Sequence, residues 1–201
     1  AQVLEPEFAR VLGYALELAA DTGGAYDPTV GPLVNLWGFG PGGPRARLPT
    51  PQEIAAARAR VGWRKLSYDP RTRTLVQPGE VYLDLSSIAT GFGIEQVARW
   101  LETQGVHDYL VELGGELRAG GRRPGGDDWR IGIERPDGDD GAPLLHTLVL
   151  RDEAIGASGD FRNFFERRGK RYSHHVDART GEVVDSRLAS VQVIHADGMH
   201  A

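Results

Sequence analysis

Five short blocks of the sequence place polar side chains beside glycine or proline, where a rigid backbone could hold them ready for chemistry. The first block, residues 25–32 (AYDPTVGP), contains Tyr26 and Asp27. Loops of this kind often carry binding groups, so Asp27 is a candidate ligand contact. The alternative is an ordinary turn in which the Asp27 side chain bonds its own backbone, and this block alone favours the turn.

The second block, residues 84–93 (DLSSIATGFG), leads from an expected strand into the start of an expected helix. Free backbone N–H groups and the positive end of the helix dipole make such a start an anion-binding site. Gly91 and Gly93 would let a ligand approach the backbone closely. A capped helix without a ligand is the alternative.

Two further blocks are ambiguous by themselves. Residues 112–116 (ELGGE) contain a glycine pair that indicates a β-bulge on a strand. Residues 157–163 gather Ser, Asp, Arg and Asn directly after an expected strand, which suits a binding loop or a solvated turn equally well.

The fifth block, residues 173–181, contains the neighbours His174 and His175. Adjacent side chains of a strand point to opposite faces, so the two imidazoles are expected to be a poor metal chelate. One of them could be a general base or stack on a ligand. A purely structural histidine is the alternative.

Hydrophobic spacing and local signals predict the elements that position these blocks. Thr50 and Glu53 form a capping box, and Asp69-Pro70 marks a hairpin turn. Helices are expected at 6–20, 50–60 and from Ser86 or Ser87 to Gln104, with a long loop over 22–49. Strands are expected at 63–68, 72–77, 81–85, 109–113, 129–134, 146–150, 154–157, 171–176 and 189–195. This mixture predicts an α+β fold.

The composition narrows the class of protein. The 201 residues, 40% of them apolar, suit one globular domain and argue against disorder. The net charge of -5 argues against a basic nucleic-acid binder. Without cysteine there is no disulfide, thiolate metal site or cysteine nucleophile. No apolar run is long enough to span a bilayer.

In their order and in their residues, the blocks also resemble the motifs of the ApbE family of FAD:protein FMN transferases. The resemblance rests on GGAYDPTVGPLVNLWGFG, LDLSSIATGFGIEQVARWLETQGVHDYLVELGGELRAGG, WRIGIERP, AIGASGDFRNFFERRGKRYSHHVDARTGEVV and SVQVIHADGMHA, which cover nearly the whole chain. It implies one domain over residues 1–201, with T-fold-related antiparallel sheets and flanking helices.

The resemblance also implies an activity: Mg²⁺-dependent cleavage of FAD, with covalent attachment of FMN to a Thr or Ser of an acceptor flavoprotein. Family members are bacterial proteins on the periplasmic or cell-envelope side of the inner membrane, often lipoproteins. A membrane link is therefore expected only through a lipid anchor outside these residues, and nucleic acid is not an expected partner.

Matching residue by residue, the resemblance implies two groups of functional residues. The cofactor-binding positions are Ala25, Tyr26, Asp27, Asp84, Thr90, Ser158, Gly159, Asp160, Arg162 and His175. Ser87 falls where a backbone carbonyl binds the metal, His174 is the candidate base, and Asp177 is the next candidate.

The sequence departs from the family pattern in several places. Thr90 stands where many members have lysine, Glu95 replaces the usual aspartate, and Ala178 follows Asp177 where proline is usual. The family's first strands would precede Ala1, and its metal-binding Asp and Thr would follow Ala201. These departures keep two alternatives open: a flavin-binding or structural homologue without transferase activity, and an FAD pyrophosphatase that releases FMN and AMP.

Overall fold

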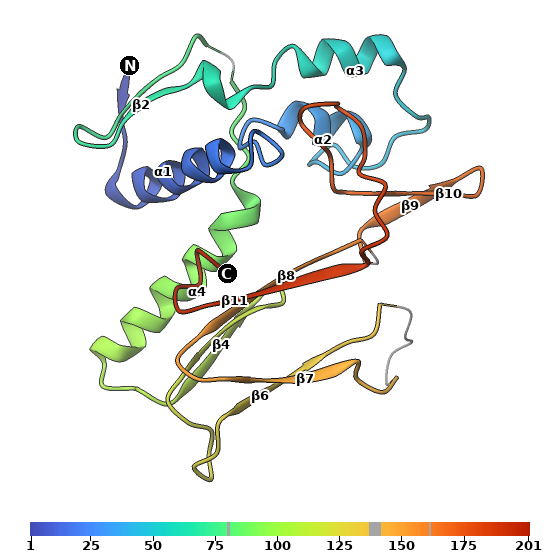
Figure 1. Cartoon of the computed structure of the whole chain (residues 1–201). Coiled ribbons are helices and arrows are strands. Elements are labelled where there is room, and N and C mark those ends of the chain that lie inside the picture. Colours follow the sequence, from blue (N-terminus) through green and yellow to red (C-terminus); the bar gives the residue numbers. More distant parts are fainter. Residues whose placement is uncertain (80, 137–141, 161) are drawn as a thin grey trace. The chain divides into compact units, whose positions relative to one another are not determined.

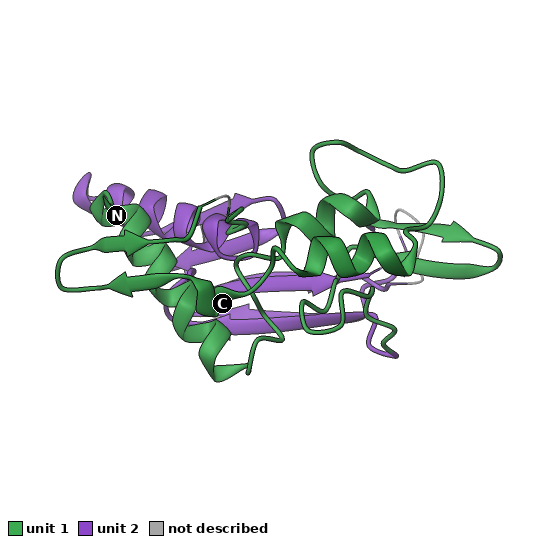
Figure 2. Cartoon of the chain, turned by 90° about the horizontal axis from the view of Figure 1, so that it is seen from above, with its two compact units in different colours: residues 1–85, 163–186 green, residues 86–162, 187–201 purple. Residues whose placement is uncertain are grey.

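The computed structural model describes residues 1–79, 81–136, 142–160 and 162–201, which form two compact units (Figure 2). Unit 1 comprises residues 1–85 and 163–186, and unit 2 comprises residues 86–162 and 187–201. The chain passes from one unit to the other after residues 85, 162 and 186. With the chain interleaved in this way, one domain over residues 1–201 stays a prediction.

Unit 1 begins with a small antiparallel sheet and a long helix (Figure 1). The sheet has the order β1-β3-β2, with β1 at Gln2–Val3, β2 at Ser67–Asp69 and β3 at Thr74–Val76. The predicted hairpin turn between β2 and β3 is confirmed, and Asp69 accepts a hydrogen bond from the Arg71 amide (2.9 Å).

The first predicted helix is confirmed as α1 (Pro6–Asp21). Its first residue is proline, which needs no hydrogen-bond partner there, and Leu12 and Leu75 lie in one core cluster. Phe8, an apolar residue in the first turn of this helix, is 40% exposed. Gly24, with φ of +83°, follows the helix in the left-handed conformation that glycine tolerates.

The predicted loop over residues 22–49 contains a helix, α2 (Gly31–Trp37), so this part of the prediction is wrong. Proline in its first turn is compatible with a helix start, and Leu33 and Trp37, four residues apart, are both buried. Their core cluster with Ile54 supplies the tertiary packing that stabilises so short a helix.

The capping box is confirmed at the start of α3 (Pro51–Arg58). The Glu53 amide donates to the Thr50 hydroxyl (3.3 Å), and the Thr50 amide donates to Glu53 Oε2 (2.8 Å). The helix ends slightly before the predicted residue 60.

Three predicted strands of unit 1 are wrong in whole or in part. Residues 63–68 begin with a 3₁₀ turn, η1 (Trp63–Lys65), before β2. Residues 81–85 form no strand, because the Asp84 amide donates to the carbonyl of Pro28 (2.7 Å) rather than to a sheet. Late in the chain, β9 (Phe164–Arg167) and β10 (Lys170–Ser173) pair as an antiparallel hairpin, so the strand expected over 171–176 ends early.

Unit 2 is built on an antiparallel sheet of order β11-β8-β5-β4, with α4 (Ser86–Thr103) packed against β4 and β5. The strands are β4 (Tyr109–Leu113), β5 (Glu116–Gly120), β8 (Ala154–Gly159) and β11 (Ser190–His195). A second pair, β6 (Trp129–Ile133) with β7 (His146–Leu150), packs on this sheet through Ile131, Leu150 and Ile155. The mixture of helices and antiparallel sheets confirms the α+β class.

The glycine pair at residues 114 and 115 is a tight turn and not the predicted bulge. Both residues have positive φ, +62° and +93°, as a two-residue hairpin turn of type I′ requires. Leu113 pairs with Glu116 across the turn, so β5 runs back along β4. Glu116 is therefore the first residue of β5.

Gly91 allows α4 to pack closely on the segment at Gly198. A Cβ built at residue 91 would lie 2.1 Å from the Gly198 carbonyl oxygen. Within the described ranges, no helix is long and apolar enough to cross a membrane.

This contact gives a stability prediction. Gly91→Ala should lower the free energy of unfolding by about 1–3 kcal/mol, since the backbone at Gly198 must shift. Gly93→Ala is the matched control, because its Cβ would meet only Leu113 Cδ2 at 3.6 Å and alanine is about 1 kcal/mol better than glycine in a helix. Urea unfolding of both variants measures the difference, and equal losses would contradict the close packing at Gly198.

Candidate functional site

In unit 1, the loop of residues 25–28 is held by the buried Asp27 carboxylate. It accepts hydrogen bonds from the Thr29 amide (2.8 Å), the Thr29 hydroxyl (2.7 Å) and the Trp63 amide (3.0 Å). The turn expected as the alternative is thus confirmed for this side chain. A contact of Ala25, Tyr26 or Asp27 with FAD stays a prediction, and Asp27 would act there by fixing the loop.

A pocket of about 550 Å³ lies beside this loop, within unit 1. Asp27 and Trp63 line it together with four basic residues: Arg58, Arg64, Lys65 and Arg179. An aromatic ring among cationic groups suits an anionic, planar ligand. Asp84 lies near the same loop, because its amide bonds the carbonyl of Pro28.

His174 and His175 follow the end of β10, so they do not alternate across a strand, and the prediction of opposite faces is wrong. Their ring centres are 4.1 Å apart. The Nδ1 atom of His174 lies 3.2 Å from the Asn163 carbonyl oxygen, to which the His174 amide also donates. A carbonyl only accepts, so Nδ1 carries the hydrogen and Nε2 has the free lone pair of a base.

An aromatic cluster fixes the region around His174. Tyr172 stacks between Trp37 (5.8 Å between ring centres) and Phe165 (5.2 Å). Phe165 in turn stacks on Phe39 (5.4 Å), whose ring meets His174 edge-on at 6.3 Å. The imidazole is therefore held by packing as well as by its hydrogen bond.

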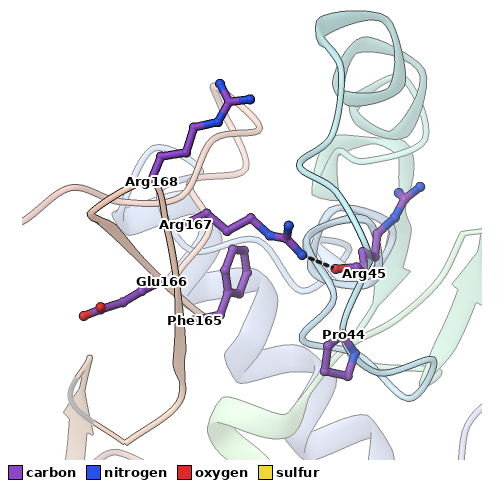
Figure 3. A pocket seen from close by; sticks show the side chains of 6 residues that line it. All are labelled: Pro44, Arg45, Phe165, Glu166, Arg167 and Arg168. Carbon is purple, nitrogen blue, oxygen red and sulfur yellow. Dashed lines mark hydrogen bonds between the residues drawn. The ribbon is translucent and has the colours of Figure 1, made fainter.

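Figure 3 shows a second pocket of unit 1, about 410 Å³ in volume and lined by Pro44, Arg45 and residues 165–168. Arg167 donates across it to the Arg45 carbonyl (3.0 Å). None of the predicted site residues lines this pocket. Its link to the site is Phe165, which belongs to the aromatic cluster.

Asp177 is engaged in an ion pair with its neighbour Arg179, with Oδ2 2.7 Å from Nη2. Hydrogen bonds from the Arg179 side chain, followed by those from backbone amides, lower the pKa of Asp177. A carboxylate with a lowered pKa is a weaker base. Of the two predicted bases, His174 is thus the better suited.

In unit 2, α4 begins at Ser86 as predicted. Ser87 is exposed and Thr90 is partly buried. Ser87, Gly91 and Glu95 follow one another at four-residue spacing, so they lie along one side of the helix.

Ser87 and Ser158 line the same cavity of about 120 Å³ in unit 2. The cavity is also lined by Glu116, which was not among the predicted site residues. Burial raises the pKa of this carboxyl. The signal in the sequence was an acidic residue directly after the glycine pair, but only the hairpin shows that it starts a strand facing α4.

The other residues of the fourth block have separate contacts. Gly159 pairs with Ser190 of β11, and the Asp160 amide donates to the Ala189 carbonyl (3.1 Å). Arg162 forms an ion pair with Glu134. Of the predicted residues in this block, only Ser158 lines the cavity.

Glu95, which replaces the family's usual aspartate, joins three segments of unit 2. Its Oε2 lies 3.2 Å from Arg118 Nε on β5 and accepts from the Gly198 amide (3.1 Å). Its Oε1 lies 3.2 Å from Arg99 Nε. Glu95 is buried and both of its carboxylate oxygens have partners, so its role is structural.

The described residues contain no group of three or more His, Cys, Asp or Glu side chains placed to hold a metal ion. A metal ion bound by these residues would therefore need ligands beyond such side chains, for example backbone carbonyl or hydroxyl oxygen atoms. The cavity at Ser87 offers the oxygen donors of Ser87, Glu116 and Ser158, which suit a hard cation.

Comparison with known proteins supports the family that the sequence motifs resemble. A sequence model of the ApbE family matches residues 1–201. The FAD:protein FMN transferase of Haemophilus influenzae is 42% identical over 202 residues, covering 98% of this chain and 58% of the relative. That of Vibrio cholerae is 44% identical over 191 residues, covering 95% of this chain and 57% of the relative.

Solved structures of flavin transferases also match this chain. The flavin transferase ApbE from Vibrio cholerae matches with a TM-score of 0.87 and 40% identity, covering 98% of this chain and 62% of that one. The apo form of Pseudomonas stutzeri flavinyl transferase ApbE matches with a TM-score of 0.86 and 40% identity, covering 100% and 61%. The chain thus spans less than two thirds of the length of these relatives, and it belongs to the ApbE family.

Proposed function

We propose that the whole protein is an FAD:protein FMN transferase. The observation that carries this proposal is the identity of more than 40% to two proteins of that name across nearly all of the chain. In the reaction, an acceptor Thr or Ser hydroxyl attacks the FMN phosphorus of FAD. The bond to the AMP oxygen breaks, AMP leaves, and the hydroxyl proton passes to a base.

His174 supports this proposal, because its fixed tautomer leaves Nε2 able to take the hydroxyl proton. The start of α4 presents backbone N–H groups of the kind that bind phosphate. The oxygen donors at Ser87 fit Mg²⁺, which would be held by the Ser87 carbonyl and would neutralise charge on the pyrophosphate.

The test is a transfer assay with the whole protein, FAD, Mg²⁺ and an acceptor flavoprotein. Transfer is read as flavin fluorescence that stays with the denatured acceptor, and AMP is measured in parallel. FMN on the acceptor with matching AMP is the expected result. FMN and AMP free in solution would instead indicate an FAD pyrophosphatase, and binding without cleavage would indicate a flavin-binding homologue.

A binding prediction accompanies this test. Asp84→Ala should weaken FAD binding, because the family match makes the Asp84 side chain an FAD contact. The backbone bond of Asp84 to the Pro28 carbonyl, which alanine keeps, places residue 84 beside the loop of residues 25–28. Calorimetric titration of FAD into the parent and the variant measures the effect. Asp69→Ala is a control, since Asp69 belongs to the β2–β3 turn, and equal FAD affinity of all three proteins would contradict the assignment of Asp84.

A further inference from the structure

The hairpin of β9 and β10 has an aromatic foot and a cationic tip. Phe165 and Tyr172 are paired across the two strands, and their rings stack with centres 5.2 Å apart. Arg167 and Lys170 lie on the same face, two residues nearer the tip, because side chains alternate along a strand. His174 directly follows β10 at the foot. The hairpin therefore connects a group of positive charges to the candidate base.

Arg168 occupies a turn position for which arginine is poorly suited. It forms the turn together with Gly169, and both residues have positive φ, +52° and +73°. A residue with a Cβ is strained in this left-handed conformation, which glycine adopts readily. Within the part of the chain that the structure describes, the exposed Arg168 side chain has neither a hydrogen bond nor an ion pair. The arginine therefore does not stabilise the turn, and its charge is available to a partner.

Four cations at this tip and on the loop beside it form the basic patch: Arg45, Arg167, Arg168 and Lys170. Arg167 joins the two segments, because it donates to the Arg45 carbonyl (3.0 Å). Lys170 pairs with Asp185 (3.2 Å), whose side chain is 81% exposed, and exposed pairs of this kind contribute little. Glu53 lies 3.3 Å from Arg45 but is bound more closely by Arg47 (2.7 Å). The basic patch therefore keeps an excess of positive charge.

Three members of the basic patch line the pocket of about 410 Å³ shown in Figure 3. Among its described lining residues only Glu166 is acidic, and Figure 3 shows its carboxylate pointing away from Arg45 and Arg167. Glu166 lies on the other face of the hairpin, where it pairs with Arg171. The chain as a whole has a net charge of -5, so this surface departs from the overall charge. Arginines around an aromatic side chain suit an acidic protein partner.

We propose that the basic patch docks the acceptor protein of the transfer reaction, through an acidic surface beside the acceptor hydroxyl. The inference rests on the proposed function, which requires a protein acceptor, and adds the surface that holds it. Phe165 in the pocket wall stacks on Phe39, whose ring meets His174, so a protein bound at the basic patch lies next to the base. Lys170 precedes His174 by four residues, a strand length of roughly 14 Å. The acidic groups of the acceptor should lie at a similar distance from its target hydroxyl.

The test uses an FMN-accepting flavoprotein whose target Thr is replaced by Val, so that docking is measured without transfer. This acceptor, fluorescently labelled, is titrated with the whole protein at low ionic strength. Arg168→Gly should weaken binding roughly 3- to 10-fold, and Arg168→Glu, which also repels an acidic partner, roughly 10- to 100-fold. Added salt should weaken binding by the parent and reduce the difference between the variants, because it screens exposed charges.

Arg73→Gly is the matched control. Arg73 is likewise an exposed arginine with positive φ (+55°), in the turn between β2 and β3, and Figure 1 shows the two hairpins at opposite ends of unit 1. Neither glycine variant should lose thermal stability, because glycine relieves the same strain in both. Only Arg168→Gly should bind the acceptor less tightly. Equal affinity of the parent and Arg168→Glu would overturn the inference, and so would a parent that does not bind the acceptor.

Two further measurements test other anionic ligands for the basic patch. Loss of FAD affinity in Arg168→Glu, with acceptor binding unchanged, would show that the patch serves the nucleotide and would overturn the inference. Loss of binding to vesicles of anionic phospholipid, again with acceptor binding unchanged, would indicate a membrane surface as the partner and would also overturn it.

FMN transfer to the unaltered acceptor keeps the two proposals apart. A parent that transfers FMN, with an Arg168→Glu variant that binds and flavinylates the acceptor equally well, would overturn the docking surface and leave the transferase standing. A parent that binds the acceptor through Arg168 but transfers no FMN would support the docking surface and overturn the transferase.

Discussion

Replacing His174 by asparagine is expected to lower the rate constant of FMN transfer roughly 100- to 10,000-fold, the usual contribution of a general base. The geometry explains why this histidine suits the task. The Asn163 carbonyl accepts from Nδ1, which leaves the lone pair of Nε2 for the acceptor proton. Single-turnover transfer to a Thr-containing acceptor measures the effect, and FAD affinity should change little.

His175→Asn is the matched control for this prediction. The two rings touch, with centres 4.1 Å apart, but only His174 has its ring fixed by the Asn163 carbonyl. His175→Asn is expected mainly to weaken FAD binding. A His174→Asn variant that transfers FMN at the parent rate would show that the base lies elsewhere. Asp177 is then the next residue to replace, although its ion pair with Arg179 lowers its pKa.

Replacing Glu95 by alanine is expected to lower the free energy of unfolding by about 3–5 kcal/mol, as removal of one partner from a buried ion pair does. The side chains of Glu95 and Arg118 are 8% and 10% exposed. Without Glu95, the Arg118 guanidinium would be buried without a counter-ion, and the Gly198 amide would lose its acceptor.

Arg99→Ala is the control for Glu95, because it removes the other cation of the same carboxylate. Arg99 is 48% exposed, so its loss should cost at most about 1 kcal/mol. Urea unfolding of both variants tests the difference, provided that the free energy of unfolding falls with urea concentration at the same slope in both. Similar losses for the two variants would contradict the central role of the Glu95–Arg118 pair.

The sequence alone determined the features whose signals lie within a few residues of one another. The capping box of Thr50 and Glu53 and the turn at Asp69-Pro70 were predicted correctly, because each is stabilised by hydrogen bonds between near neighbours. The start of α4 and the strand Tyr109–Leu113 were also predicted correctly. The family could be identified in the same way, since its motifs are short continuous stretches.

Other features required the tertiary structure, because their causes are distant in the sequence. The helix α2 is stabilised by packing against α3, and residues 81–85 bond a loop far earlier in the chain instead of a strand. The glycine pair reads as a bulge until β5 is seen to run back along β4. The early end of β10 likewise decided that the two histidine rings lie together.

The partners of the charged residues also depend on contacts that are distant in the sequence. Glu95 and Glu116 are both acidic residues beside glycine-rich stretches, and nothing local distinguishes them. Their difference arises because Arg118, 23 residues after Glu95, reaches that carboxylate and not Glu116. The sequence determined which charged residues the chain contains, and the packing of α4 on β5 decided which carboxylate has a counter-ion.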